Sequence, residues 1–270
     1  MRKSKMLEKF RGGQFARVCV LGHSIPFYIR HAANLKYDGL WLDLEHRAMS
    51  DQEVRHLLAL CHYNDIDCMV RPPTVERTQL YRYLEDGATG FMIPFISSAA
   101  DARHVVESVK FPPLGNRGFD GAGLDADYGL ESGRSVSAFT TEANEQTFIV
   151  AQIETPEALM NIDEIAAVPG IDCLFIGPGD LSLRLSVSED PTKVSLADAV
   201  VRVAGAARRN SKVWGMAVAS VEAVTQYAQM GAQILPWGSD FWLTKVLEER
   251  SRELDEILKG TPTTGLRKEP

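Results

Sequence analysis

The sequence contains 270 residues, of which 45% are hydrophobic, and its formal net charge is −7. This length and hydrophobic fraction fit one large globular domain with a sizeable core. The acidic balance argues against a nucleic-acid-binding protein, which would need a basic face, and no apolar run approaches the ~20 residues of a membrane span.

The amino-terminal segment MRKSKMLEKFRGG is basic but lacks the apolar stretch of a secretory signal. The four cysteines show no CxxC spacing, and three of them lie in apolar contexts. We therefore expect reduced, buried thiols in a cytoplasmic protein.

Eight short apolar runs recur along the chain, and most are followed by a helical pattern. Apolar strands that alternate with helices indicate a parallel sheet covered on both faces, and eight such units predict a single (β/α)₈ barrel domain over residues 1–259. A doubly wound sheet is the alternative, but no GxGxxG follows the first run. The runs span residues 17–22, 39–44, 67–72, 90–95, 148–153, 172–177, 213–218 and 233–238.

Three segments depart from this pattern. Residues 111–146 are rich in Gly and Asp and too long for an ordinary connection, so we expect a functional loop or an interface excursion there. The amphipathic segment 239–258 is more apolar than one barrel's outer ring requires, which predicts packing on a neighbouring subunit. Residues 260–270 have no periodicity and are predicted to be a disordered tail.

Polar residues are concentrated at the C-terminal ends of the predicted strands, where (β/α)₈ barrels hold their active sites. The predicted N-terminal ends show no such concentration. The residues at the C-terminal ends are His23, Asp43, Glu45, His46, Arg71, Gln152, Glu154 and the segment Gly177-Pro178-Gly179-Asp180.

Glu154 and Asp180 follow neighbouring predicted strands, so their carboxylates would repel each other unless a cation lies between them. Mg²⁺ or Mn²⁺ accepts one or two carboxylates and leaves its other positions to water and substrate. Gly179 lets the backbone approach a ligand, and a helix that opens at Asp180 would attract an anion such as a substrate carboxylate. This combination suits a 2-oxo acid, although either carboxylate alone could be a solvated loop residue.

Arg71, held at a strand end before two prolines, could stabilise an enolate oxygen, and His46 is a candidate general acid or base near neutral pH. The alternatives are an ordinary salt bridge for Arg71 and a structural role for His46. No lysine stands within a predicted strand or at its C-terminal end, so an imine-forming aldolase is disfavoured.

The segments YDGLWLDLEH, VRPP, LEDGATGFMIPF, FPPLGNRG, AQIETPEAL and IDCLFIGPGDLS, in this order, resemble the HpcH/HpaI aldolase family over about residues 15–258. The resemblance implies a (β/α)₈ barrel that forms hexamers, as a trimer of dimers that exchange their last helix. It also implies a reversible aldol reaction between a pyruvate enolate and an aldehyde, with Mg²⁺, Mn²⁺ or Co²⁺ as the divalent cation.

The same resemblance assigns roles to five residues. It implies Glu154 and Asp180 as metal ligands, His46 as the acid/base and Arg71 as the pyruvate contact, with Gln152 beside the site.

Three places depart from the family pattern, and the first, GPGDLS where members often show GPADLS, changes little because backbone N–H groups do the binding. Glu85 stands where some members have an aspartate that pairs with the histidine, so we expect Glu85 to support His46. Relatives carry basic residues in the loop that holds Asp120, Asp125 and Asp127 here, and we expect this acidic loop to favour neutral or hydroxylated aldehydes.

Two other functions are considered. A CoA-ester lyase of the malyl or citramalyl type would need basic residues for the nucleotide, and beyond Arg71 and Arg117 no basic cluster lies near a strand end. A non-catalytic barrel would have lost some of the residues Glu154, Asp180, Arg71 and His46, all of which are present.

Overall fold

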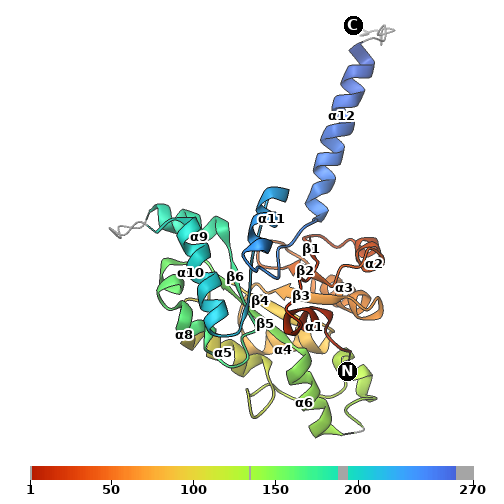
Figure 1. Ribbon diagram of the computed structural model, residues 1–270. Helices are drawn as coiled ribbons and strands as arrows, with labels where there is room; N and C mark the ends of the chain where they lie inside the picture. The colour runs from red at the N-terminus through yellow and green to blue at the C-terminus, as the bar shows by residue number, and fades with distance from the viewer. Residues whose placement is uncertain (1, 134, 188–193, 260–270) are drawn as a thin grey trace, which may run out of the picture.

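The computed structural model describes residues 2–133, 135–187 and 194–259. In this part of the chain seven strands form one curved parallel sheet in chain order, with helices on its outer side (Figure 1). The strands are β1 (Val18–Leu21), β2 (Gly39–Asp43), β3 (Asp67–Arg71), β4 (Gly90–Ile93), β5 (Phe148–Ile153), β6 (Cys173–Ile176) and β7 (Val213–Met216).

The eighth predicted strand, residues 233–238, is not a regular strand, so seven of the eight predicted strands are confirmed. Pro236 has no N–H to donate to a ladder, which explains why the pairing is interrupted. The segment nevertheless connects the two edges of the sheet through isolated parallel bridges between Ala16 and Ile234, Gly215 and Ile234, and Val20 and Ser239.

Helices follow most strands, and the side chains of Ser50, Ser98, Thr155 and Ser220 each accept a backbone N–H at a helix start. The helices are α1 (Lys5–Arg11), α2 (Pro26–Asn34), α3 (Asp51–Tyr63), α4 (Arg77–Glu85), α5 (Ala99–Val109), α6 (Val136–Gln146), α7 (Pro156–Met160), α8 (Ile162–Ala166), α9 (Pro178–Ser186), α10 (Leu196–Arg209), α11 (Val221–Gln229) and α12 (Leu243–Lys259). Two 3₁₀ segments, η1 (Leu124–Gly129) and η2 (Asp240–Trp242), complete the described elements.

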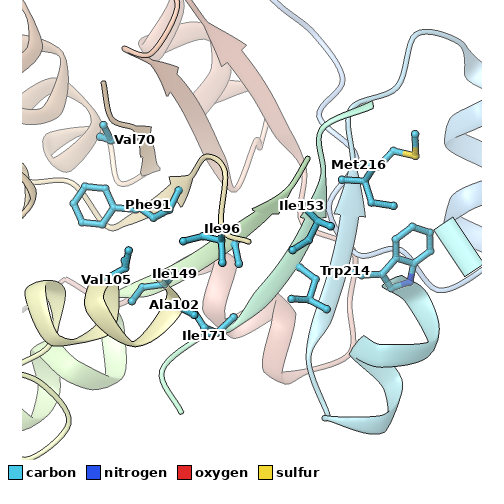
Figure 2. Close-up of a cluster of buried hydrophobic side chains, with 14 of the residues drawn as sticks. Val70, Phe91, Ile96, Ala102, Val105, Ile149, Ile153, Ile171, Trp214 and Met216 are labelled. Carbon is cyan, nitrogen blue, oxygen red and sulfur yellow. The ribbon is translucent and has the colours of Figure 1, made fainter. Parts of the chain in front are cut away.

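Side chains alternate along each strand and so build two separate cores. The outward residues of the strands pack against the helices, as Figure 2 shows for Val70, Phe91 and Ile149 near Val105 of α5. The inward residues form a second cluster, which includes Trp41, Met69, Met92, Phe148, Val150, Cys173 and Phe175.

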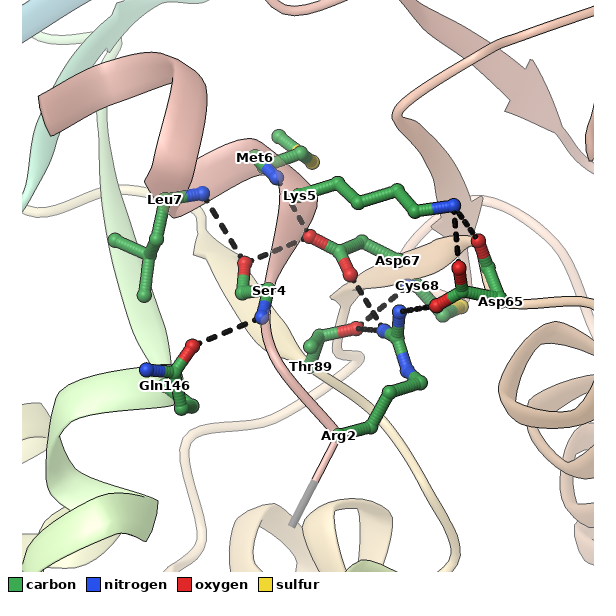
Figure 3. A network of polar contacts seen from close by, with 10 residues as sticks. All are labelled: Arg2, Ser4, Lys5, Met6, Leu7, Asp65, Asp67, Cys68, Thr89 and Gln146. Carbon is green, nitrogen blue, oxygen red and sulfur yellow. Dashed lines mark hydrogen bonds and ion pairs between the residues drawn. The ribbon is translucent and has the colours of Figure 1, made fainter. Parts of the chain in front are cut away.

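The amino-terminal segment closes the inner core at the N-terminal ends of the strands. Met6, Leu7 and Phe10 of α1 belong to the inner cluster. Beneath them, the fully buried carboxylate of Asp67 at the start of β3 accepts hydrogen bonds from the Ser4 hydroxyl (2.7 Å) and the Met6 N–H (2.8 Å), as Figure 3 shows. The opposite end, where the strands finish, is therefore the one left for a site.

Arg2 supplies the positive charge for this buried carboxylate. Its guanidinium donates to Asp67 at 2.5 Å and also contacts Thr89 and the exposed Asp65 (Figure 3). A buried charge is costly unless it is paired and hydrogen-bonded, and Asp67 meets both conditions.

The segment 111–146, predicted as a long loop, instead contains η1 and helix α6. The Ser135 side chain caps α6, and Phe139 and Ala143 of this helix are buried with Phe111 and Ala126 in a small cluster of their own. Only two residues of α6 are buried in this cluster, so the sequence of α6 shows no clear apolar periodicity from which a helix could be predicted.

Helix α12 extends away from the rest of the protein, and none of its residues is buried (Figure 1). Its residue range, Leu243–Lys259, overlaps the amphipathic segment predicted at residues 239–258. The tail predicted as disordered, residues 260–270, lies outside the described residues.

The four cysteines are free and buried, as predicted. Among the described residues no helix is long and apolar enough to cross a membrane.

Candidate active site

On β2, β3, β5 and β6, the inward-facing side chains are apolar along most of the strand. At the C-terminal end, the next inward-facing positions hold the predicted site residues. Trp41 is followed two positions later by Asp43, and Met69 by Arg71. In the same way Val150 precedes Gln152 and Glu154, and Phe175 precedes Gly177. The alternation therefore gathers the predicted site residues above the inner core.

Arg71 and Asp43 form a bidentate ion pair between adjacent strands. The Arg71 Nε and Nη2 atoms donate to the two Asp43 oxygens at 2.9 and 2.8 Å, and the guanidinium lies 4.8 Å from the Trp41 ring centroid. Burial alone would raise the pKa of Asp43, but the hydrogen bonds and charge of Arg71 hold it below its usual value. Nη1 of Arg71 lies 3.2 Å from Glu45 Oε2.

Glu154 is a buried carboxylate without an ion-pair partner among the described residues. Its Oε2 accepts the backbone N–H of Phe95 at 3.2 Å, and its Oε1 accepts from Gln152 Nε2 at 2.5 Å. Burial, assisted by the negative charges of Glu45 and Asp180, raises the pKa of Glu154 to about 7. Gln152 Oε1 is buried and has no hydrogen-bond partner in the part of the chain that the structure describes.

Phe95, which supports Glu154, was not found by sequence reasoning. It follows β4 and adopts a left-handed backbone conformation with φ of 54°. Such a conformation is unfavourable for a bulky residue and is tolerated where the surrounding structure requires it. The segment GFMIPF contains no signal for it.

The two glycines of GPGD have different surroundings. A Cβ at Gly177 would lie 2.2 Å from Glu154 Oε1 and 2.8 Å from Gln152 Nε2, so only glycine fits there. A Cβ at Gly179 would meet nothing within 4 Å. Gly179 lies in the first turn of α9, where backbone N–H groups have no helical partner and can receive an anion.

Asp180, also in the first turn of α9, is partly exposed and lies 3.8 Å from Arg184. Its charge is one of those that raise the pKa values of Glu45 and Glu154, although burial is the larger cause for both. No group of three or more His, Cys, Asp or Glu side chains in the described residues could hold a metal ion by itself. Two carboxylates and the unpartnered amide oxygen of Gln152 are nevertheless the oxygen donors that a hard cation prefers.

His46 follows this cluster on the exposed side. Its Nε2 lies 3.5 Å from Glu45 Oε2, and its backbone N–H points to Asp43 at 3.4 Å. Glu85, expected to support His46, is the last residue of α4, which returns the chain to the N-terminal end of β4. No interaction joins Glu85 to His46 in the described chain; burial raises the pKa of Glu85, and Arg117 opposes that effect.

The acidic loop lies with Glu85 rather than with Glu154. A Cβ at Gly123 would meet the backbone of Glu85 at 2.8 Å, and Asp125 is buried in a 2.6 Å ion pair with Arg117. The expectation that these carboxylates set the charge around the site is therefore not met within one chain.

Two partly or fully buried lysines lie at the same N-terminal end. Lys110 donates to the carbonyls of Asn144 and Thr147, and Lys212 donates to the Ile171 carbonyl at 2.7 Å. Neither contacts a residue of the candidate site.

Known proteins resemble this chain over most of its length. A family model described as HpcH/HpaI aldolase/citrate lyase matches residues 18–245. The chain is 33% identical, over 83% of its length and 85% of the relative's, to the 2-dehydro-3,6-dideoxy-6-sulfogluconate aldolase of Pseudomonas putida. It is 31% identical, over 95% of its length and 93% of the relative's, to the hydroxypyruvate/pyruvate aldolase of Pseudomonas aeruginosa.

A solved HpcH/HpaI aldolase from Desulfitobacterium hafniense DCB-2 superposes with a TM-score of 0.82 at 30% identity, covering 96% of this chain and 98% of that one. The chain therefore belongs to the HpcH/HpaI aldolase/citrate lyase family, and its curated relatives are named as aldolases, which are carbon–carbon lyases.

Proposed function

We propose that the protein cleaves a 4-hydroxy-2-oxo acid reversibly to pyruvate and an aldehyde, with a divalent cation. The observation that carries this proposal is the buried carboxylate of Glu154, whose pKa is raised to about 7 by burial and by the nearby charges of Glu45 and Asp180. A relative named hydroxypyruvate/pyruvate aldolase supports a 2-oxo acid as one half of the substrate.

Glu154 and Asp180 would hold Mg²⁺, Mn²⁺ or Co²⁺, with Gln152 beside them. When bound, the cation would supply positive charge for the developing enolate oxygen. The free N–H groups at Gly179 and Asp180 would bind the substrate carboxylate at the start of α9.

Arg71 would donate to the enolate oxygen from a guanidinium that cannot rotate, because Asp43 and Glu45 already orient it. Preorganised donors of this kind lower the barrier because they need not reorient as charge develops.

His46 would move the proton of the 4-hydroxyl group. In the cleavage direction its Nε2 accepts this proton while the C3–C4 bond breaks, which releases the aldehyde and leaves the pyruvate enolate. Its position beside Glu45, with more than half of the ring exposed, leaves it free to exchange the proton with water.

The test of this function is a screen of 4-hydroxy-2-oxo acids for pyruvate release with Mg²⁺, Mn²⁺ or Co²⁺. Metal-dependent release that EDTA abolishes is the expected result. Full activity in EDTA, or trapping of a pyruvate adduct by borohydride, would contradict it.

Glu154→Gln and Asp180→Asn keep side-chain size but each remove a negative oxygen donor. We expect both variants to lose metal-dependent turnover and to bind Mn²⁺ more weakly by at least ~10²-fold, since even indirect ligand supports are worth 10–100-fold. Calorimetric titration with Mn²⁺ measures this. Asp163→Asn, which changes an exposed carboxylate paired with Arg209, is the matched control and should bind normally.

Arg71→Lys keeps the charge but loses the planar fork that spans Asp43 and Glu45. We expect exchange of the pyruvate C3 hydrogens with deuterated water, followed by NMR, to slow by ~10²–10³-fold. Arg117→Lys, at an equally buried ion pair at the other end of the barrel, should leave this exchange near the wild-type rate. Near-normal exchange in Arg71→Lys would refute the assignment.

Gly177→Ala and Gly179→Ala are the same change two residues apart. The first would displace the Glu154 carboxylate and should lower turnover by ~10²-fold, the typical effect of a 1 Å misplacement, whereas the second should stay within about threefold. Steady-state pyruvate release measures both. Equal activity of the two variants would argue against Glu154 as a site residue.

We also propose a homo-oligomer of even-numbered units, a hexamer that exchanges α12 being the expected form. Exposed Leu243, Val246, Leu247 and Leu254 form an apolar stripe at helical spacing on α12. Light scattering at micromolar concentration should show an oligomer, and Leu247→Glu with Leu254→Glu should reduce its mass. Glu256→Lys, on the opposite side of the helix, should not. A monomeric wild type would contradict this proposal.

A further inference from the structure

A cleft of about 580 Å³ opens beside the candidate site, between the segment after β2 and the start of α4. Glu45 and His46 form one wall, and Glu45 also touches Arg71 at 3.2 Å. The cleft therefore shares Glu45 and His46 with the candidate site. Its other walls include Leu44, Met49, Pro73, Thr74, Gln79 and Tyr83.

Arg47 is the one arginine or lysine among the residues that line this cleft. Its Nη1 donates to the His46 carbonyl at 2.7 Å, and its guanidinium carbon lies 4.6 Å from the Phe241 ring centroid. These two contacts hold the side chain in place. Its Nε is buried without a hydrogen-bond partner, and no ion pair to Arg47 occurs among the described residues.

Phe241 packs between two residues of the segment after β1. Gly22 leaves room for the Phe241 ring, because a Cβ there would lie 2.8 Å from it. On the other side His23 lies 4.9 Å from the ring and is tied to the buried Asp240 at 2.7 Å.

Neither of the carboxylates that line the cleft, Glu45 and Asp51, forms an ion pair with Arg47 among the described residues. Glu45 is matched by Arg71, and Asp51 is the first residue of α3, where the helix N-terminus favours a negative charge. The acidic residues Asp120, Asp125 and Asp127 lie at the other end of the barrel and do not line it.

We propose that this cleft holds the aldehyde half of the substrate and that Arg47 selects an aldehyde whose far end carries an oxyanion, such as a carboxylate. The inference rests on the proposed aldolase function. It reverses the expectation of a neutral aldehyde, because that expectation depended on the acidic loop. The Arg47 guanidinium carries a positive charge that a carboxylate would match, and the apolar residues Leu44, Met49 and Pro73 accommodate an aliphatic chain.

The experiment compares two acceptors of similar length in the addition direction, succinic semialdehyde and pentanal, with pyruvate and saturating Mn²⁺. The measured quantity is the ratio of kcat/KM for the charged acceptor to that for the neutral one. A loss of folded enzyme cannot change this ratio. We expect wild type to favour succinic semialdehyde and Arg47→Gln to lower the ratio by ~10–100-fold, the usual effect of a charge-assisted hydrogen bond.

Two further variants sharpen the result. Arg47→Lys keeps the charge without the fork and should give an intermediate ratio. Arg55→Gln removes an exposed arginine of α3 that pairs with Asp86 outside the cleft, and it should keep the wild-type ratio.

A wild type without preference for the charged acceptor, or an Arg47→Gln variant with an unchanged ratio, would overturn the inference. Exchange of the pyruvate C3 hydrogens in wild type separates this failure from failure of the proposed function. Exchange with an unchanged ratio refutes the role of Arg47 alone, whereas absence of exchange refutes the aldolase function and the inference together.

Discussion

The site depends on the ion pair between Asp43 and Arg71, which are direct neighbours in the register of β2 and β3. Both side chains point inward, directly above Trp41 and Met69 of the inner core. A guanidinium in such a place is costly unless a carboxylate pairs with it. The bidentate geometry provides that pairing and at the same time fixes the direction of the remaining Arg71 N–H groups.

This pairing also explains why Glu154 is unusual. The positive charge of Arg71 is already divided between Asp43 and Glu45, so little of it stabilises the Glu154 carboxylate. Burial and two neighbouring negative charges then raise the pKa of Glu154 to about 7. An arrangement that left Arg71 unpaired would lower this pKa.

The sequence predicted seven of the strands and the polar residues at their C-terminal ends, because each depends on a local period or a short motif. It missed the left-handed Phe95, the partner of Asp125 and the cationic Arg47 at the cleft, which depend on contacts between distant segments. Glu85 was assigned to His46 from a motif, although the end of α4 has to return to the start of β4.

Two buried carboxylates at opposite ends of the barrel, Asp67 and Glu154, have different kinds of partner. At the N-terminal end Asp67 receives Arg2, Ser4 and a backbone N–H, so the protein itself supplies every partner that the carboxylate needs (Figure 3). At the C-terminal end, among the described residues, Glu154 has only neutral donors and Gln152 Oε1 has none. A buried charge is costly unless it is paired, which is the physical reason that the pKa of Glu154 lies above its ordinary value.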